Sequence, residues 1–346
     1  MKVSRRDFLR YCTTAAGLLG LEAALGPLEK ALANTSGPPI IWLQGANCGG
    51  CTVSLANRIS SSAPVDLTDL LINTVDLVYS APLMAAAGDL AVQTLRNAEA
   101  GTFILVVEGG IPTQYNGRTC TVFSQNGRHV TALAAVQELA PKAKYVLSVG
   151  ACASFGGIPG AAPNPTAIQS VQKVSGVSPI NVPGCPPHPD WIVWTIAQLL
   201  AGTVPRLDWH QRPTALYGTT VHSQCSRQTK PWASSLSQTG LCNRNLGCKG
   251  RETYADCPTR LWNNKMNWCV GTISANGNGA DSICQGCTNS GFPDNLAPLF
   301  STQGALPFGH RKVSPPRSGC RTCHGESGDH GGSRRSSSDP AFPSRT

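Results

Sequence analysis

The sequence predicts an α/β protein built on a doubly wound parallel sheet, followed by a smaller and irregular C-terminal domain. Three observations support this fold class. Short apolar runs rich in β-formers alternate with helical stretches between residues 39 and 200. That rhythm stops near residue 204, where Gly, Asn, Trp and Cys become frequent. Four cysteines of the first part follow predicted strands, where a parallel sheet places its sites.

The predicted strands are short runs of the kind that parallel sheets bury on both faces. They are Ile40–Gln44, Val75–Tyr79, Phe103–Val107, Tyr145–Val149 and Ile180–Val182, and the predicted helices between them are Thr52–Ser60, Leu83–Ala98 and Asp190–Leu200. Alternating strands and helices imply a flavodoxin-like sheet, whose strands all have their carboxyl ends at one edge. We expect this domain to span residues 34–203 and an irregular C-terminal domain to span residues 204–300.

Residues 1–33 have the features of an export signal. The pair Arg5-Arg6 precedes an apolar run, Ala15–Leu25, that is too short to span a bilayer, and Ala31–Ala33 has the small residues of a cleavage site. An ordinary amphipathic N-terminal helix is the alternative. We expect twin-arginine export of a folded protein to the periplasm, and no membrane anchor is visible in this chain.

The formal charge of +9 is concentrated at the two ends of the chain. Residues 34–300 hold 16 Lys and Arg against 13 Asp and Glu, and no basic stripe with interleaved aromatic residues occurs among them. A nucleic-acid partner is therefore not expected.

Four cysteines of the first domain follow three predicted strands. They are Cys48, Cys51, Cys152 and Cys185. Strand ends of one parallel sheet can bring these thiols to one point, and four thiolates are what a [4Fe–4S] cluster requires. Structural zinc and a disulfide framework are the alternatives. Twin-arginine export favours a cofactor inserted before export. Cys120 lacks such a setting and is interpreted as a small core residue.

The irregular part contains one histidine and seven cysteines that divide into two groups of four. They are His222, Cys225, Cys242, Cys248, Cys257, Cys269, Cys284 and Cys287. A segment with so little apolar periodicity needs metal to organise it. The histidine could instead be a core residue with its hydrogen bonds satisfied, but its place three residues before a cysteine favours ligation.

The chain closely resembles the small subunits of [NiFe] hydrogenases. The resemblance runs from the twin-arginine signal to about residue 300, and its motifs are Cys48-Gly-Gly-Cys51, Val107-Glu-Gly-Gly-Ile-Pro112, Gly150-Ala-Cys152, Gly184-Cys185-Pro-Pro, His222-x-x-Cys225, Cys257-Pro-Thr-Arg-Leu-Trp-Asn and Cys284-Gln-Gly-Cys287. It implies an electron-transfer protein that forms a heterodimer with a separate large subunit, which holds the Ni–Fe site. The chain would pass electrons from H2 oxidation to an external acceptor such as a c-type or b-type cytochrome.

The resemblance also implies three cluster sites. The proximal [4Fe–4S] cluster would take Cys48, Cys51, Cys152 and Cys185; the distal [4Fe–4S] cluster would take His222, Cys225, Cys242 and Cys248. The medial cluster would take Cys257, Cys284 and Cys287, and is [3Fe–4S], or [4Fe–4S] if Cys269 is the fourth ligand. Glu108 could relay protons or accept hydrogen bonds at a strand end, and no catalytic residue is expected in this chain.

Oxygen-tolerant relatives carry two additional cysteines near the proximal cluster. Gly50 and Gly157 stand at the matching positions here. The resemblance therefore implies a standard cube and an oxygen-sensitive enzyme.

Residues 301–346 form a Ser-, Arg-, Pro- and Gly-rich tail that we expect to be disordered. It contains Cys320-Arg-Thr-Cys323-His324, the spacing of covalent c-type haem attachment. The alternative is a fortuitous match in a biased sequence.

Three other functions compete with the hydrogenase assignment. A complex I-type cluster protein would share the first domain, but it lacks the export signal and the ligands between residues 222 and 287. A secreted protein stapled by disulfides would contain no iron. A hydrogen sensor would have the same parts, but such sensors are usually cytoplasmic.

Overall fold

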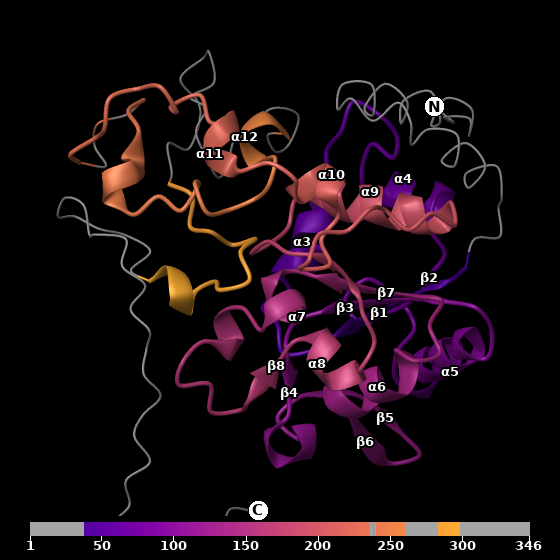
Figure 1. The fold of residues 1–346 in the computed structure, drawn as a ribbon. Coiled ribbons are helices and arrows are strands. Elements are labelled where there is room, and N and C mark those ends of the chain that lie inside the picture. Colours follow the sequence, from indigo (N-terminus) through magenta and orange to yellow (C-terminus); the bar gives the residue numbers. More distant parts are fainter. Residues whose placement is uncertain (1–37, 236–237, 239, 261–282, 298–346) are drawn as a thin grey trace, which may run out of the picture. The chain divides into compact units, whose positions relative to one another are not determined.

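The structure is a computed structural model that describes residues 38–235, 238, 240–260 and 283–297 (Figure 1). The predicted export signal, Cys269 and the tail with its haem-attachment motif lie outside the described residues. Among the residues that are described, no helix is both long and apolar enough to cross a membrane.

Five parallel strands between residues 40 and 182 form one sheet. Its strand order is β2-β1-β3-β7-β9, with β1 at Ile40–Gln44, β2 at Leu77–Ser80, β3 at Ile104–Glu108, β7 at Tyr145–Val149 and β9 at Ile180–Val182. In order of the chain this is 2-1-3-4-5, the flavodoxin-like order. The predicted fold class is confirmed. Three predicted strands have the observed bounds, and the other two are displaced by one or two residues.

Helices cover both faces of this sheet because alternate strand residues point to opposite sides. Along β1, Ile40 and Trp42 belong to one apolar cluster, and Ile41 and Leu43 belong to the other. The first cluster includes residues of α3 (Gly50–Ala56), α4 (Leu67–Asn73), α9 (Pro189–Leu200) and α10 (Thr214–Tyr217). The second includes residues of α5 (Gly88–Glu99), α6 (Ala132–Leu139) and α8 (Val171–Ser175). Burial on both faces explains the continuous apolar runs of the strands.

Two small antiparallel pairs stand beside the main sheet. β4 (Ile111–Pro112) pairs with β8 (Ile168–Gln169), and β5 (Thr121–Gln125) forms a hairpin with β6 (Arg128–Thr131). Asn126 and Gly127 both have positive φ, as the tight turn of such a hairpin requires. The remaining short elements here are η2 (Gln114–Gly117), α7 (Ala151–Phe155) and η3 (Ile158–Gly160).

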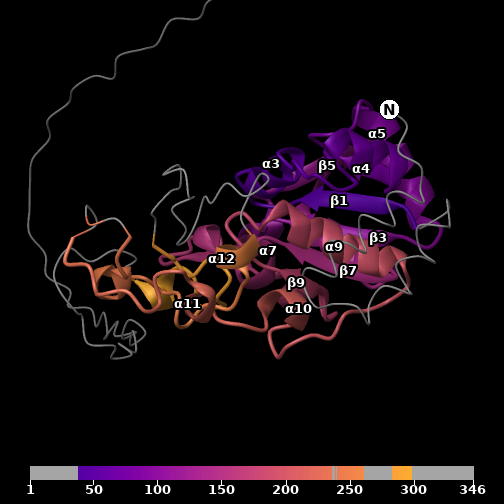
Figure 2. The same ribbon diagram turned by 90° about the horizontal axis from the view of Figure 1, so that it is seen from above.

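After α10, the described chain has only short helical turns. They are α11 (Val221–Gln224), η4 (Asn243–Leu246), α12 (Cys257–Arg260) and η5 (Asp294–Leu296). α11 and α12 lie side by side (Figures 1 and 2). Trp191 of α9 holds this part, because its Nε1 donates to Asp256 Oδ1 over 2.7 Å. Within the same part, Arg260 Nη2 lies 2.6 Å from Asp256 Oδ2. Arg260 also lies 3.7 Å from Asp190.

Candidate metal centres

Three loops at one edge of the sheet bring four cysteines together. Cys48 and Cys51 follow β1, Cys152 lies in α7 after β7, and Cys185 follows β9. α3 and α7 lie beyond the same end of the strands (Figures 1 and 2). Each of the other three thiols acts electrostatically on Cys51, so the four form one group. None of them is in a disulfide.

Burial makes this group a poor place for thiolates without a positive partner. It raises the pKa of Cys51, and Glu108 and the other three thiols raise it further. Burial, followed by Cys185 and Cys48, raises the pKa of Cys152 to about 12. Cys185 as a residue is exposed, but desolvation around its sulfur, followed by the charges of Cys287 and Cys48, raises its pKa to about 11. A coordinating metal removes this difficulty because it binds the deprotonated form.

Two glycines lie in close contact with the cysteines of this group. A Cβ at Gly150 would lie 2.5 Å from Cys51 Sγ, and Gly150 has a φ of 93°. A Cβ at Gly157, where φ is 55°, would lie 2.8 Å from the backbone nitrogen of Cys152. Glycine is therefore required at both positions for the thiols to approach each other as they do.

Glu108 lies at the carboxyl end of β3, directly behind the first pair of cysteines. Its side chain is buried, with 1% exposed. Oε1 accepts from the backbone N–H groups of Cys51 at 3.1 Å and Thr52 at 3.3 Å. Oε2 accepts from Trp42 Nε1 at 3.0 Å, Gln44 Nε2 at 3.3 Å and the hydroxyl of Thr52. Every one of these partners is a donor, which favours the strand-end acceptor over the proton relay.

Asn47 orders the loop between β1 and α3. Its Oδ1 accepts from the N–H of Gly49 at 2.6 Å, and its Nδ2 donates to the carbonyl of Gly45 at 2.9 Å. Such side-chain bonds to nearby backbone are how asparagine stabilises tight turns. The loop with Cys48 is therefore held at both ends.

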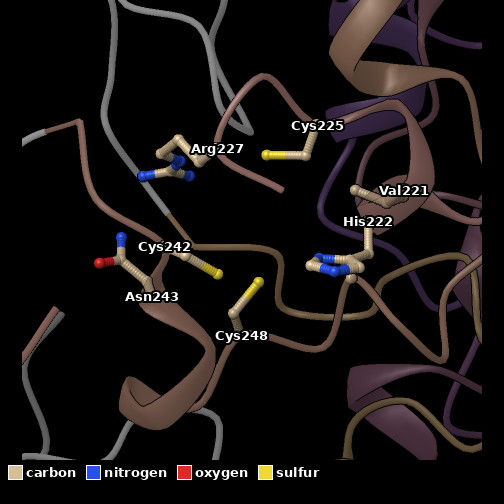
Figure 3. Close-up of a pocket in the computed structure, with 8 residues that line it drawn as sticks. Val221, His222, Cys225, Arg227, Cys242, Asn243 and Cys248 are labelled. Atoms are coloured by element: carbon tan, nitrogen blue, oxygen red, sulfur yellow. The ribbon is translucent and has the colours of Figure 1, made fainter. Parts of the chain in front are cut away.

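The predicted distal ligands line one pocket (Figure 3). Its lining residues are Val221, His222, Cys225, Arg227, Cys242, Asn243, Cys248 and Gly250. Thr220 caps the short helix α11 by accepting from the N–H of Ser223 at 3.3 Å, which fixes the turn that presents His222. The imidazole and the three sulfur atoms surround a common space (Figure 3). Soft thiolates with one imidazole are a donor set that suits an iron–sulfur cluster.

The electrostatics of this pocket suit its donors. Burial, followed by Arg251 and Arg244, lowers the pKa of His222, which favours the neutral imidazole that binds metals. Burial raises the pKa of Cys248, while backbone N–H groups of Gly250 and Cys284 donate to its sulfur and act in the opposite direction. Hydrogen bonds of this kind tune the potential of a cluster.

The predicted medial ligands connect the two groups. Burial raises the pKa of Cys284, with further contributions from Cys248 and Cys287. Cys287 in turn acts on Cys185 of the first group. Cys257 and Cys287 both act on the buried Tyr217, whose hydroxyl donates to the carbonyl of Pro183 at 3.0 Å. Cys185, Cys287, Cys284 and Cys248 therefore form a series in which each thiol interacts electrostatically with the next, from the sheet edge to the pocket of Figure 3.

The spacing of these groups differs from that of a single-ion site. Within the described ranges, no three His, Cys, Asp or Glu side chains lie close enough together to hold one metal ion. An iron–sulfur cube is larger than an ion, and each of its irons binds its own thiolate, so its ligands need not converge so closely.

Sequence reasoning did not identify the residues that support the thiols. Trp42, Gln44 and Thr52 hold Glu108, and Thr253 forms a side-chain hydrogen bond with Cys284. Arg227 is buried in the wall of the pocket. Only the place of Trp42 and Gln44 on β1, in register with β3, could have indicated their role. Cys120 packs half-buried against an apolar cluster, as expected of a core residue.

Comparison with known proteins separates the alternatives. The family model described as NADH ubiquinone oxidoreductase, 20 Kd subunit, matches residues 48–199. The family model for the C-terminal part of the NiFe/NiFeSe hydrogenase small subunit matches residues 217–300. The first match agrees with a domain shared with complex I-type proteins, and the second distinguishes the hydrogenase small subunits from them.

Relatives match the chain over most of its length. The periplasmic [NiFeSe] hydrogenase small subunit of Desulfomicrobium baculatum is 35% identical over 326 residues, covering 87% of this chain and 99% of the relative. The periplasmic [NiFe] hydrogenase small subunit of Solidesulfovibrio fructosivorans is 35% identical and covers 86% and 93%. A solved structure of recombinant [NiFeSe] hydrogenase from Desulfovibrio vulgaris Hildenborough has a TM-score of 0.70 at 35% identity, covering 78% and 99%. The chain therefore belongs to the [NiFe] and [NiFeSe] hydrogenase small subunits, the subunits that transfer electrons in these enzymes.

Proposed function

We propose that this chain carries electrons from H2 oxidation at a separate Ni–Fe subunit through three iron–sulfur clusters to an external acceptor. The observation that supports it most directly is the gathering of donors. Four thiols meet at one sheet edge, and three thiols and an imidazole line one pocket. Thiolates are soft donors and imidazole also suits iron, so both sets of four fit cluster ligation.

Each group of donors is assigned to one cluster. The proposed ligands are Cys48, Cys51, Cys152 and Cys185 for the proximal [4Fe–4S] cluster, and His222, Cys225, Cys242 and Cys248 for the distal [4Fe–4S] cluster. Cys257, Cys284 and Cys287 are assigned to the medial cluster. Whether it is [3Fe–4S] or [4Fe–4S] depends on Cys269, and haem c on Cys320, Cys323 and His324 is a separate prediction.

When bound, the clusters supply one-electron carriers whose potentials depend on ligands, hydrogen bonds to sulfur and burial. The chain's own residues set those conditions. Glu108 fixes the backbone of Cys51. N–H groups of Gly250 and Gly286 donate to Cys248 and Cys284. Burial around Cys284 excludes water from the centre of the path.

The exposed thiols indicate where the large subunit would bind. Cys48 and Cys185 are exposed at the sheet edge, whereas the other two thiols of that group are partly covered. A partner that packs on this edge would shield both thiols and bring its Ni–Fe site close to the proximal cluster. We propose that the two subunits assemble in the cytoplasm and that the twin-arginine signal exports the complex to the periplasm.

Metal analysis of the anaerobically purified heterodimer tests this assignment. Cys225→Ala should lower the iron content by about four atoms per chain and remove one EPR signal, because the distal cluster loses a ligand. Cys120→Ala is the matched control and should change neither. A colourless complex whose thiols are paired as disulfides would overturn the proposal. Haem staining of the denatured chain tests the tail motif.

A further inference from the structure

The segment around the pocket of Figure 3 has an unusual charge. Residues 222–251 contain five basic side chains, Arg227, Lys230, Arg244, Lys249 and Arg251, and no Asp or Glu. Among the described residues, no carboxylate forms an ion pair with Lys230, Arg244 or Arg251. Residues 34–300 as a whole are nearly balanced in charge, so the basic excess is local.

An exposed tryptophan lies within this basic segment. Trp232 is 56% exposed, and the guanidinium of Arg244 lies over its ring, 4.9 Å from the centroid. The backbone next to Trp232 pairs with that of Cys242: Ala233 N–H donates to Cys242 O, and Cys242 N–H donates to Pro231 O, both at 2.9 Å. Trp232 is therefore paired through the backbone with Cys242, one of the donors that line the pocket.

The basic side chains lie around the same pocket. Arg251 and Arg244 both act electrostatically on His222, and Arg227 forms part of the pocket wall. Lys230 and Arg251 are exposed, and the N–H of Lys230 donates to Arg227 O at 3.1 Å. We call Lys230, Trp232, Arg244 and Arg251 the basic face.

We propose that the basic face is the docking surface for an acidic electron-carrier protein, with Trp232 as its central contact. The inference rests on the proposed function, because the pocket must hold the cluster from which electrons leave. Tryptophan and arginine are the residues that most often dominate protein interfaces. Unpaired positive charge would steer a negatively charged partner to this site and raise its association rate. Each acceptor gains one electron and no atom is transferred, so two acceptors are reduced for each H2 oxidised to two protons.

The test compares two forms of one carrier that differ in charge. Native basic cytochrome c and the same cytochrome with succinylated lysines would be titrated into the anaerobic heterodimer by calorimetry, and their reduction under H2 would be followed by absorbance. We expect the acidic form to bind at least tenfold more tightly at low ionic strength. The preference should vanish at about 0.5 M salt, where screening is nearly complete. Tighter binding of the native form would overturn the proposal.

Variants assign the effect to the basic face. Lys230→Glu with Arg251→Glu should weaken binding of the acidic cytochrome at least tenfold, whereas the matched reversals Arg128→Glu in β6 and Lys173→Glu in α8 should not. Trp232→Ala should weaken binding, and Trp232→Phe should restore most of it. Equal effects of both pairs of reversals would overturn the proposal. Binding of anionic lipid vesicles without a charge effect on either cytochrome would do so as well, by indicating a membrane contact.

Two controls separate this proposal from the function on which it rests. H2/D2 exchange reports the Ni–Fe site without any acceptor, and EPR reports the clusters. If the exchange rate and the EPR signals are normal but substitutions in the basic face do not change binding of the acidic cytochrome, only the docking proposal fails. If the cluster signals are absent, both fail.

Discussion

Replacing Glu108 by glutamine tests how the proximal thiols are positioned. The substitution keeps the size of the side chain but leaves one acceptor oxygen. If the new amide nitrogen faces the backbone, the N–H groups of Cys51 and Thr52 lose their acceptor. In the other orientation, Trp42 Nε1 and Gln44 Nε2 lose theirs. Either way, at least two hydrogen bonds to a buried carboxylate are lost.

The expected cost follows from those two bonds. A hydrogen bond to a charged group contributes about 1.5–3 kcal/mol, so Glu108→Gln should lower the free energy of unfolding by about 3–6 kcal/mol. Urea unfolding of the anaerobic heterodimer would measure it, and EPR would show a weakened proximal cluster signal. The matched control is Glu138→Gln, whose half-exposed ion pair with Arg96 should contribute less than about 1 kcal/mol.

The same variant decides between the two roles considered for Glu108. A stability change below about 1 kcal/mol with an unchanged cluster signal would refute the anchoring role. If stability is unchanged but H2/D2 exchange with solvent protons is abolished, Glu108 is a proton relay. Loss of stability with normal exchange per intact cluster would support the anchor.

Three further predictions follow from the described geometry. Gly150→Ala should abolish the proximal cluster signal, because its Cβ would lie 2.5 Å from Cys51 Sγ, and iron analysis would show the loss. His222→Cys should lower the potential of the distal cluster in a redox titration, because a thiolate adds negative charge where imidazole is neutral. Burial of Glu99 opposes ionisation, but hydrogen bonds from Lys142 and Arg96 outweigh it, and its pKa lies below the ordinary 4.5. Its stabilisation is therefore present above that pH and lost as the pH falls below it, which urea midpoints measured against pH would show.

Each of these predictions has a control in the same chain. Gly176→Ala has a similar positive φ but nothing within 4 Å of the new Cβ, so it should retain all iron. His129→Cys in the exposed hairpin should leave every cluster potential unchanged. Glu99→Gln should flatten the acid dependence of stability. An unchanged iron content in Gly150→Ala would contradict the steric argument, and a raised distal potential in His222→Cys would contradict the charge argument. If Glu99→Gln loses stability at low pH as the unchanged protein does, the argument from the pKa of Glu99 is wrong.

The sheet and the group of four cysteines at its edge could be predicted because both depend on local patterns, whereas the other two ligand sets were predicted from the family resemblance. Gly150 follows Tyr145–Val149, and Pro179 and Pro183 flank Ile180–Val182, so these limits are visible in the sequence. The hairpin of β5 and β6 was missed, because its strands are half exposed and lack a clear apolar pattern. α4 was missed as well; only Leu70 among its residues is buried.

The support of the site could not be predicted, because it depends on contacts between residues far apart in the chain. Trp42 and Glu108 are 66 positions apart, and only the parallel pairing of β1 with β3 makes them neighbours. Likewise, the charge of residues 222–251 is visible in the sequence, but the placement of Arg244 over Trp232 is not.

The bonds among α9, Asp256 and Arg260 have a consequence for the rate at which electrons move. Trp191 bonds to Asp256 and Asp190 lies 3.7 Å from Arg260, and these two partners stand on either side of Cys257 in the chain. Tunnelling slows steeply as the gap between donor and acceptor widens, so a hinge between these parts would make the current fluctuate. The buried indole of Trp191 and the guanidinium of Arg260 would restrain this part against the sheet, so the distance between clusters held on its two sides would vary little during electron transfer.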